Sequence, residues 1–395
     1  MVADIRELNR GTVLAELLCR RGASRRDIAA ATGISPTTVT RAVESLLADG
    51  VVVEGPQLAA GTRGRRAVPL HLAATRGHVV GVDLGASNTR LIVADLAGNP
   101  VACRQVPTDR AATPDGLAQQ VRREAMALAG HAWASVEWVG IGLPGAVRLA
   151  DGSISNAPNL PQIEDPAFVT TLRQILDHPV MFDNDVNFAL LGELHFGAAC
   201  EATTAAMLTI GTGLGSALAI RREVLRGERG LVGEFGLLPA GPLGMPLENL
   251  VTGPGILRRA AEARLTMTSP DELFVADPSP QVARLRTQFD QAVLIVLAAL
   301  TVACEPQCVV VGGRVGASLM AHAERYRRAL LAMLQQAPAI VPAALGDYCG
   351  AAGAVAACLQ ACYRQMGADE ARLVDLPVGG TLTSAAIARY TDPRR

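Results

Sequence analysis

Three apolar segments that each end in a glycine-rich turn constrain the fold of this chain more than any other feature of its sequence. The first, 78–85, is followed closely by a second apolar stretch over 91–98. The other two cover 207–216 and 309–313. Short apolar runs bounded by glycine are typical of buried β-strands. Three of them at wide spacing predict an α/β protein with two related lobes around one cleft.

The turns after these segments are rich in small and hydroxyl-bearing residues. Such turns let backbone N–H groups approach a phosphate closely. The candidate phosphate-loop residues are Gly85, Ser87, Asn88, Thr89, Gly211, Thr212, Gly213, Gly312 and Gly313. An ordinary hairpin turn uses the same residue types, so the structural alternative stays open at each position.

A polar cluster follows the short apolar run 180–182. It contains two aspartates and two asparagines, which are Asp183, Asn184, Asp185 and Asn187, and an apolar helix follows. Capping of that helix needs one such residue. Four within five positions indicate a ligand site, because open α/β sheets bind ligands where a strand ends and a helix begins.

The first 75 residues have a different character. Apolar residues at helical spacing predict helices over 12–21, 24–32 and 35–47. Gly22 and Gly33 end the first two, and Ser24 and Ser35 cap the second and third. Two alternating segments, 51–54 and 68–72, then flank an arginine-rich tip at 61–66. This order predicts a winged helix-turn-helix, which places one helix in the major groove of DNA.

Charge supports that interpretation. Residues 1–75 hold ten arginines against seven acidic residues, a net charge of +3, whereas the whole chain carries −1. A basic segment on an acidic remainder suggests a polyanion partner for the segment alone. The expected DNA-binding residues are Ser35, Thr37, Thr38, Thr40, Arg41, Arg63, Arg65 and Arg66. The structural alternative is a solvated helical bundle with a basic loop.

Cysteine usage and apolar runs bear on the compartment. The eight cysteines are scattered without a C-x-x-C pair, which fits a reducing cytoplasm better than a disulfide framework. The N-terminus has no signal-peptide pattern. The longest apolar run, 292–304, is shorter than the roughly 18 residues of a membrane span. We therefore expect a soluble cytoplasmic protein without a membrane partner.

Nearly the whole chain resembles the ROK family of repressors, open reading frames and sugar kinases, within the actin/hexokinase-like ATPase superfamily. The resemblance rests on the motifs at 83–89, 140–145, 157–160, 184–185, 211–215, 230–236 and 311–313, together with the winged helix-turn-helix that marks the family's repressors. It implies a DNA-binding head followed by a two-lobed, kinase-like α/β domain.

The resemblance also implies roles for individual residues. Asn159, Asn184, Asp185, Glu234 and Glu248 would hydrogen-bond sugar hydroxyls. Asp185 would be the general base of the kinase members, because a carboxylate next to a sugar hydroxyl can accept its proton.

One departure from the family pattern concerns metal binding. Family members usually have a histidine shortly after the Gly-Glu pair and then a cysteine-rich, zinc-binding stretch. Here the histidine position is Leu237, and 240–248 contains no cysteine. Leucine cannot bind a metal, so we predict no zinc and no other metal cofactor, and a more apolar pocket wall. ATP binding stays open.

These observations predict three segments: a DNA-binding domain over 1–75, a ligand-binding and dimerisation domain over 76–366, and a weakly structured tail over 367–395. The leading hypothesis is a sugar-responsive transcriptional regulator, a repressor, that binds double-stranded operator DNA as a homodimer or tetramer. One alternative is an ATP-dependent sugar kinase with a fused DNA-binding head. Another is a constitutive DNA binder without a ligand.

Overall fold

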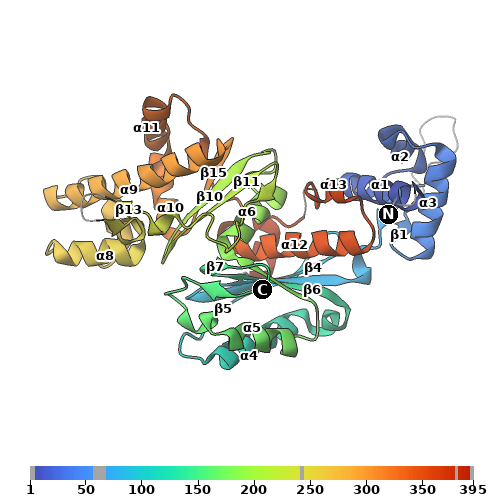
Figure 1. Ribbon diagram of the computed structural model, residues 1–395, viewed down its shortest axis with the longest axis horizontal. Coiled ribbons are helices and arrows are strands. Elements are labelled where there is room, and N and C mark those ends of the chain that lie inside the picture. The colour runs from blue at the N-terminus through green and yellow to red at the C-terminus, as the bar shows by residue number, and fades with distance from the viewer. Residues whose placement is uncertain (1–4, 57–67, 241–243, 379–380, 392–395) are drawn as a thin grey trace.

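The computed structural model describes residues 5–56, 68–240, 244–378 and 381–391, and Figure 1 shows how they are arranged. A small helical head lies at one end of the molecule. Two α/β lobes follow along the chain, and the C-terminal residues return to the region between the head and the lobes. The order of a helix-turn-helix followed by a kinase-like α/β domain is the predicted one.

The head contains three helices and a two-stranded antiparallel sheet. These elements are α1 (Ile5–Arg20), α2 (Arg25–Thr32), α3 (Pro36–Ala48), β1 (Val52–Glu54) and β2 (Leu70–Leu72). Ser24 caps α2 in a capping box with Asp27, and Gly33 ends that helix in the left-handed conformation. Ser35 caps α3, with Pro36 in the first turn. The predicted starts of α2 and α3 and the stop at Gly33 are confirmed, because each depends only on neighbouring residues. The predicted start of the first helix at residue 12 is wrong, since α1 covers Ile5–Arg20.

Lobe 1 is built on a five-stranded sheet of order β5-β4-β3-β6-β9. Its strands are β3 (His78–Leu84), β4 (Asn88–Asp95), β5 (Pro100–Pro107), β6 (Val136–Leu143) and β9 (Val180–Asn184). Helices α4 (Pro114–Ala129) and α5 (Pro166–Ile175) cover its outer face. A small hairpin, β7 (Ala146–Val147) and β8 (Ile154–Ser155), lies beside it.

Lobe 2 is built on a second five-stranded sheet of order β12-β11-β10-β15-β16. Its strands are β10 (Ala205–Ile210), β11 (Leu214–Ile220), β12 (Glu223–Val224), β15 (Cys308–Gly312) and β16 (Ala339–Pro342). Its further elements are the hairpin β13 (Pro239–Ala240) and β14 (Met245–Pro246) and the helices α7 (Glu248–Val251), α8 (Gly253–Glu262), α9 (Pro280–Cys304), α10 (Arg314–Leu319) and α11 (Ala323–Leu334).

The two sheets share one topology. In each, three consecutive strands form an antiparallel meander, and two later strands add in parallel beside the first strand of the meander. This repetition confirms the predicted pair of related lobes. The recurring apolar run and glycine turn mark the first strand of each meander, β3 and β10, and the strand β15.

Two buried helices join the lobes. Helix α6 (Asp185–Phe196) packs against lobe 2, and α12 (Cys349–Gln365) packs against lobe 1. The helices meet almost backbone to backbone, since a Cβ added at Gly353 would lie 1.6 Å from the carbonyl oxygen of Phe188. A Cβ at Gly192 would lie 2.5 Å from the carbonyl oxygen of Cys349. Only glycine permits this approach, so α6 and α12 form one rigid unit.

The described C-terminal residues are ordered and packed, and the predicted weakly structured tail is wrong for them. They include α13 (Glu370–Leu373) and α14 (Ser384–Thr391). Leu373, Leu376, Leu382 and Ile387 are buried in the same core as the head and the α6–α12 pair. These apolar residues lack a clear period along the sequence, and their burial depends on partners far away in the chain.

Helix α9 differs from its expected length. The apolar run 292–304 is only its second half, and the complete helix has 25 residues. Among the described residues it is the one helix long and apolar enough to cross a membrane by length and composition. One side of it, including Phe289, Val293 and Leu297, lies in the core of lobe 2.

Candidate functional site

The predicted polar cluster lies where β9 ends and α6 begins. Asn184 is the N-cap of α6: its side-chain oxygen accepts hydrogen bonds from the backbone N–H groups of Val186 and Asn187, at 2.9 and 3.1 Å. Its side-chain nitrogen donates to the carbonyl oxygen of Gly145 at 2.8 Å. Most of its hydrogen-bonding capacity is therefore used within the protein, and one amide N–H remains for a ligand.

Asp183 has a structural position. Its carboxylate is buried, forms an ion pair with Arg226 at 2.6 Å, and accepts hydrogen bonds from Asn187 and from the backbone of Asn184. Arg226 lies on the segment of lobe 2 that leads to Glu234. The ion pair therefore ties that segment to the start of α6.

Asp185 is half-buried and lies among other carboxyl groups. Burial, together with the neighbouring charges of Asp83 and Glu234, raises its pKa to about 8. Burial likewise raises the pKa of Asp83 to about 6, against the lowering effect of Arg90. At neutral pH the ligand-free Asp185 is mostly protonated, so it can donate a hydrogen bond as well as accept one.

Glu234 and Glu248 face the same region from lobe 2. Burial and then the charge of Glu248 raise the pKa of Glu234 to about 7, and burial raises the pKa of Glu248. The hydroxyl of Ser216 donates to the carbonyl oxygen of Gly233, which fixes the backbone before Glu234. Three of the predicted sugar-binding carboxyl groups, those of Asp185, Glu234 and Glu248, thus lie close enough to influence one another's charge.

Asn159 connects the predicted sugar-binding residues with the predicted phosphate-loop residues. A Cβ added at Gly213 would lie 3.7 Å from the side-chain nitrogen of Asn159. Asn159 belongs to lobe 1 and Gly213 to the β10–β11 turn of lobe 2. A predicted sugar-binding residue and a predicted phosphate-loop residue therefore meet where the two lobes face each other.

The glycines of the phosphate turns divide into two groups. A Cβ at Gly313 would lie 2.4 Å from the carbonyl oxygen of Ile210, one at Gly312 would lie 3.0 Å from Met207, and one at Gly85 would lie 2.9 Å from the carbonyl oxygen of Asn88. Close packing alone explains why glycine occupies these three positions. Gly211 has no atom within 4 Å of its added Cβ, and neither Gly211 nor Gly213 has a positive φ. Packing within the protein therefore does not require glycine at Gly211 or Gly213, and the space beside them is open to a ligand.

The other predicted phosphate-loop residues differ in exposure. Ser87 and Thr212 are exposed, whereas Asn88 is half-buried and accepts a hydrogen bond from Gln105 at 3.3 Å. Thr89 is 1% exposed, and its hydroxyl pairs with that of Thr108 at 2.9 Å. The Thr89 side chain is therefore closed to a ligand, because alternation along β4 turns it into the core.

Arg90 lies close to the same turn. Its guanidinium is 3.8 Å from the carboxylate of Asp83 and 3.2 Å from that of Asp347. It also donates to the side chain of Gln105 at 3.0 Å. A protein cation thus stands beside Asp83, a position that nothing in the sequence singled out.

Leu237 is 50% exposed at the end of the short turn that begins at Glu234. Within the described ranges, no group of three or more His, Cys, Asp or Glu side chains could hold a metal ion. The stretch 240–248 was predicted to lack zinc ligands, and its residues 241–243 lie outside the described ranges.

The head presents the expected face of α3. Thr37 and Arg41 are exposed. The hydroxyls of Ser35 and Thr38 pair at 2.9 Å, and that of Thr40 donates to the carbonyl oxygen of Pro36 at 2.9 Å. A hydroxyl donates only one hydrogen, so the Thr40 hydroxyl is left chiefly as an acceptor. Arg63, Arg65 and Arg66 lie outside the described residues.

Two arginines missed by the sequence reasoning lie beside this face. Arg25 and Arg26, in the first turn of α2, line a shallow hollow with Ile34, Pro36 and Thr40. Arg25 is also paired with Glu54 at 3.0 Å, and Arg26 is exposed. The sequence did contain a signal for them, because both arginines directly follow the helix cap Ser24. Cations at a helix N-terminus are unfavourable for the helix dipole, so their presence there suggests an anionic binding partner.

Comparison with known proteins agrees with this geometry. The winged helix-turn-helix DNA-binding family matches residues 8–53, and the ROK family matches residues 79–361. The fold and the cleft define a kinase-like two-lobed α/β protein that carries a DNA-binding type of head. The chain belongs to the ROK family.

Three relatives illustrate the range of the family. The chain is 28% identical to a putative xylose repressor from Caldicellulosiruptor sp. (strain Rt8B.4) over 59% of each chain. It is 31% identical to the ROK hexokinase from Thermus thermophilus, with a TM-score of 0.58 over 70% of this chain and 96% of that one. A ROK family transcriptional regulator, a homolog of the E. coli MLC protein, shares the fold with a TM-score of 0.74 at 20% identity, over 94% and 99% of the two chains.

Proposed function

We propose that this protein is a sugar-responsive transcriptional regulator, a repressor, whose kinase-like domain binds a sugar or sugar derivative as an effector. One observation carries the proposal: a winged helix-turn-helix head shares a continuous apolar core with a two-lobed domain whose cleft gathers the carboxyl groups of Asp185, Glu234 and Glu248. Its similarity to a putative xylose repressor supports the same function.

The effector lies between the lobes in this proposal. Asn159, Asn184 and Asp185 approach it from lobe 1 and α6, and Glu234 and Glu248 approach it from lobe 2. Carboxyl and amide groups at the junction of two lobes suit a ligand that offers many hydroxyls, because each hydroxyl can donate and accept. A ligand held from both sides favours one angle between the lobes over others.

The head binds double-stranded operator DNA through α3. Thr37, Arg41 and the hydroxyls of Ser35, Thr38 and Thr40 face the groove, with Arg25 and Arg26 near the phosphates. Arg63, Arg65 and Arg66, which lie outside the described residues, remain predicted contacts of the same interface. Such a regulator acts in the cytoplasm, where the DNA of a bacterium lies.

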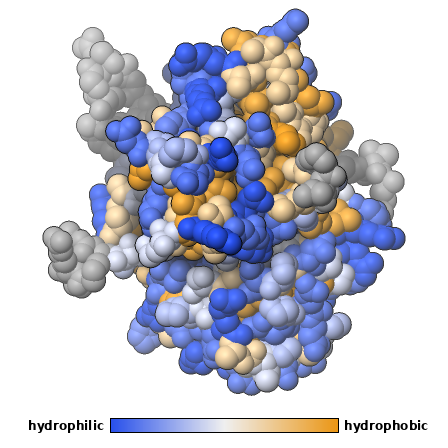
Figure 2. All heavy atoms as spheres, turned by 90° about the vertical axis from the view of Figure 1, so that its left-hand side faces the viewer, coloured by the Kyte–Doolittle hydropathy of each residue, from blue (hydrophilic) through white to orange (hydrophobic). Residues whose placement is uncertain are grey.

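A single head reads a half-site, so the regulator acts as a homodimer or a tetramer. Lobe 2 offers a surface for this assembly: Val302 on α9 is 70% exposed and Met333 on α11 is 56% exposed, with Ile295 and Leu331 also exposed. Figure 2, which faces this end of the molecule, shows apolar side chains gathered on one side of it. We assign the contact between copies to this face of α9 and α11.

A sugar kinase with a DNA-binding head is the second candidate. The unfilled space at Gly211 and the similarity to the hexokinase favour it. Mg-ATP fits the turns only in part, because Thr89 is buried and Arg90 stands beside Asp83. Leu237 also replaces the family's histidine. We therefore propose a regulator without catalytic turnover.

A thermal-shift screen tests the proposal. Wild-type protein is heated with D-xylose, D-glucose or N-acetylmannosamine, with and without Mg-ATP. A sugar at a hundred times its dissociation constant adds about 2.7 kcal/mol of stability, and the Glu234→Ala variant should lose that gain. A shift that requires ATP and sugar together, with ATP consumption lost in Asp185→Asn, would favour the kinase instead.

A further inference from the structure

The C-terminal segment, residues 366–391 as far as they are described, contacts the head directly. The side chain of Arg10 donates to the carbonyl oxygen of Met366 at 2.7 Å, and the backbone N–H of Asp369 donates to that of Gly11 at 3.2 Å. The approach is close, since a Cβ added at Gly11 would lie 2.6 Å from the carbonyl oxygen of Gly367. Helix α1 of the head is therefore seated on this segment.

Arg372 supplies the one ion pair of this contact among the described residues. Its guanidinium is 2.8 Å from the carboxylate of Glu16 and 3.1 Å from the sulfur of Cys19, both on α1. Glu16 is 7% exposed and also pairs with Arg20. A buried carboxylate that loses a cationic partner is destabilised, so this pair favours one seating of the head over others.

The same segment is bound to α6 and to lobe 2. The carbonyl oxygen of Pro377 is hydrogen-bonded to the ring nitrogen Nδ1 of His195, near the end of α6, at 2.9 Å. Asp375 forms an ion pair with Arg222 of lobe 2 at 3.5 Å. Arg222 in turn donates to the carbonyl oxygen of Leu194, also on α6, at 2.7 Å.

Lobe 1 binds the segment as well. The hydroxyl of Thr381 pairs with the side chain of Asn99 at 2.5 Å, and that of Tyr390 donates to the carbonyl oxygen of Pro100 at 2.9 Å. The segment thus touches the head, α6 and both lobes, and a change in the angle between the lobes strains at least one of these contacts.

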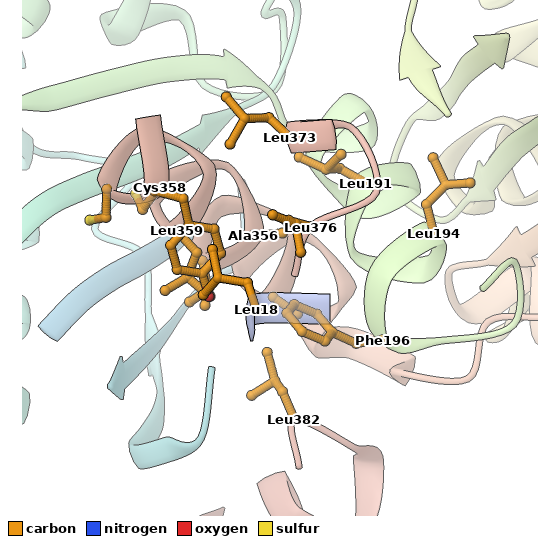
Figure 3. Close-up of a cluster of buried hydrophobic side chains, with 14 of the residues drawn as sticks. Leu18, Leu191, Leu194, Phe196, Ala356, Cys358, Leu359, Leu373, Leu376 and Leu382 are labelled. Carbon is orange, nitrogen blue, oxygen red and sulfur yellow. The ribbon is translucent and has the colours of Figure 1, made fainter. Parts of the chain in front are cut away.

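Apolar packing makes the junction continuous. Figure 3 shows Leu18 of α1 in one cluster with side chains of α6, α12 and the C-terminal segment. The labelled members from α6 are Leu191, Leu194 and Phe196, and those from the segment are Leu373, Leu376 and Leu382. Close-packed cores of this kind transmit displacements because they do not deform continuously.

Helix α6 connects this junction to the cleft. It begins at Asp185, between the cleft carboxyl groups, and ends at Phe196, against the segment. Every residue from Val186 to Phe196 is buried, and α12 is packed against its backbone. The helix therefore moves as a rigid rod, and a displacement at one end appears at the other.

We propose that the C-terminal segment is the element through which ligand binding in the cleft changes the seating of the DNA-binding head, and that the Arg372–Glu16 pair is its coupling contact. This inference rests on the proposed regulatory function. It names a two-state element that both sites can bias, which is the physical requirement for coupling between them.

The test measures operator affinity with and without sugar in Arg372→Gln, Glu16→Gln and wild type. The operator is a DNA fragment that the protein itself selects from random sequences. The sugar is whichever of D-xylose, D-glucose and N-acetylmannosamine shifts the melting temperature most. In wild type the sugar should change the dissociation constant for DNA by about 5- to 150-fold. In both variants this ratio should fall towards one, while the dissociation constant for sugar changes by less than about threefold.

Arg364→Gln is the matched control. Arg364, in the last turn of α12, pairs at 2.9 Å with Glu370 of the segment, but both side chains are exposed and neither has a described bond to the head. This variant should keep the full sugar response. A full response in Arg372→Gln and Glu16→Gln as well would overturn the coupling role.

Hydrogen exchange on wild type covers the case in which the variants fold poorly. Sugar should change the exchange of amides in 366–378 and in α1, and unchanged exchange in both segments would overturn the proposal. A wild type whose DNA affinity ignores every sugar would instead contradict the regulatory function itself, so the two failures are distinguishable.

Discussion

Lobe 1 and lobe 2 share a sheet topology but have different surroundings. Lobe 1 lies against the head: the side chain of Arg21 donates to the carbonyl oxygen of Ala97 at 3.3 Å, and that of Arg76, just before lobe 1, donates to the backbone of Asp49 at 3.1 Å. The ion pairs and side-chain hydrogen bonds described for lobe 2 include none to residues 5–56, and its link runs through Arg222 and the C-terminal segment.

This difference suggests that the two lobes have different roles although their sheets share one topology. In the proposed mechanism, lobe 1 is the base to which the head is attached, and lobe 2 is the part whose movement a ligand controls. The exposed apolar face of α9 and α11 belongs to lobe 2 as well. In that mechanism, movement of lobe 2 changes both the seating of the head and the relation between copies of the chain.

Breaking the joint between the lobes should have the largest effect. The Gly353→Ala substitution places a Cβ 1.6 Å from the carbonyl oxygen of Phe188, so α6 and α12 must separate. We expect a loss of more than about 4 kcal/mol and failure to give soluble folded protein. Soluble yield and circular dichroism measure this. A Gly353→Ala protein as stable as wild type would contradict the tight joint.

The apolar face of lobe 2 is tested by charge. Val302→Glu should convert the assembly to monomers, weakening association by about 2 kcal/mol or more, which corresponds to about thirtyfold. Val101→Glu places the same charge on an exposed valine of lobe 1, at 41% exposure, and should leave the assembly intact. Sedimentation velocity distinguishes the outcomes, and equal dissociation in both variants would refute the assignment to lobe 2.

The glycine turns of lobe 2 give a matched pair. Gly313→Ala meets the carbonyl oxygen of Ile210 at 2.4 Å with φ at +78°, so a loss of about 1–3 kcal/mol is expected. Gly211→Ala meets nothing within 4 Å and should keep the wild-type melting temperature. If Gly211→Ala alone abolished an ATP-dependent thermal shift, the turn would be a phosphate site and the kinase hypothesis would gain support.

The smallest effect concerns pH. The pKa of Asp185 is raised in the folded protein to about 8, so the folded state binds more protons than the unfolded state. Stability from this group is present at low pH and is lost as pH rises from about 4 to about 8. Asp185→Asn should therefore stabilise the ligand-free protein at pH 8 by about 1 kcal/mol, after allowance for partial exposure. An identical pH dependence of melting temperature in both proteins would contradict the raised pKa.

Local signals made the head and the strands predictable. Serine caps, the glycine stop at Gly33 and the apolar period of α3 depend on residues close in sequence. The recurring glycine turns predicted two lobes for the same reason. Of the predicted sugar site, Asp185, Glu234 and Glu248 come together in the structure, and Asn159 meets Gly213.

What the sequence could not provide depends on contacts between distant segments. Leu376 and Leu382 look like parts of a loose tail until α1 and α6 enclose them. The inward position of Thr89 and the pairing of Arg90 with Asp347 also depend on neighbours far along the chain. The sequence does not distinguish a helix-capping role of Asn184 from a sugar-binding role, because an asparagine side chain suits both.

The most direct test of the regulatory function is a fluorescence-anisotropy titration of the selected operator fragment with wild type and Glu234→Gln. The three monosaccharides are added in turn. We expect one of them to change the wild-type dissociation constant for DNA by about tenfold or more. The variant should bind DNA equally well and ignore the sugar. A wild-type affinity that no sugar changes, or a sugar response that survives in Glu234→Gln, would contradict the account.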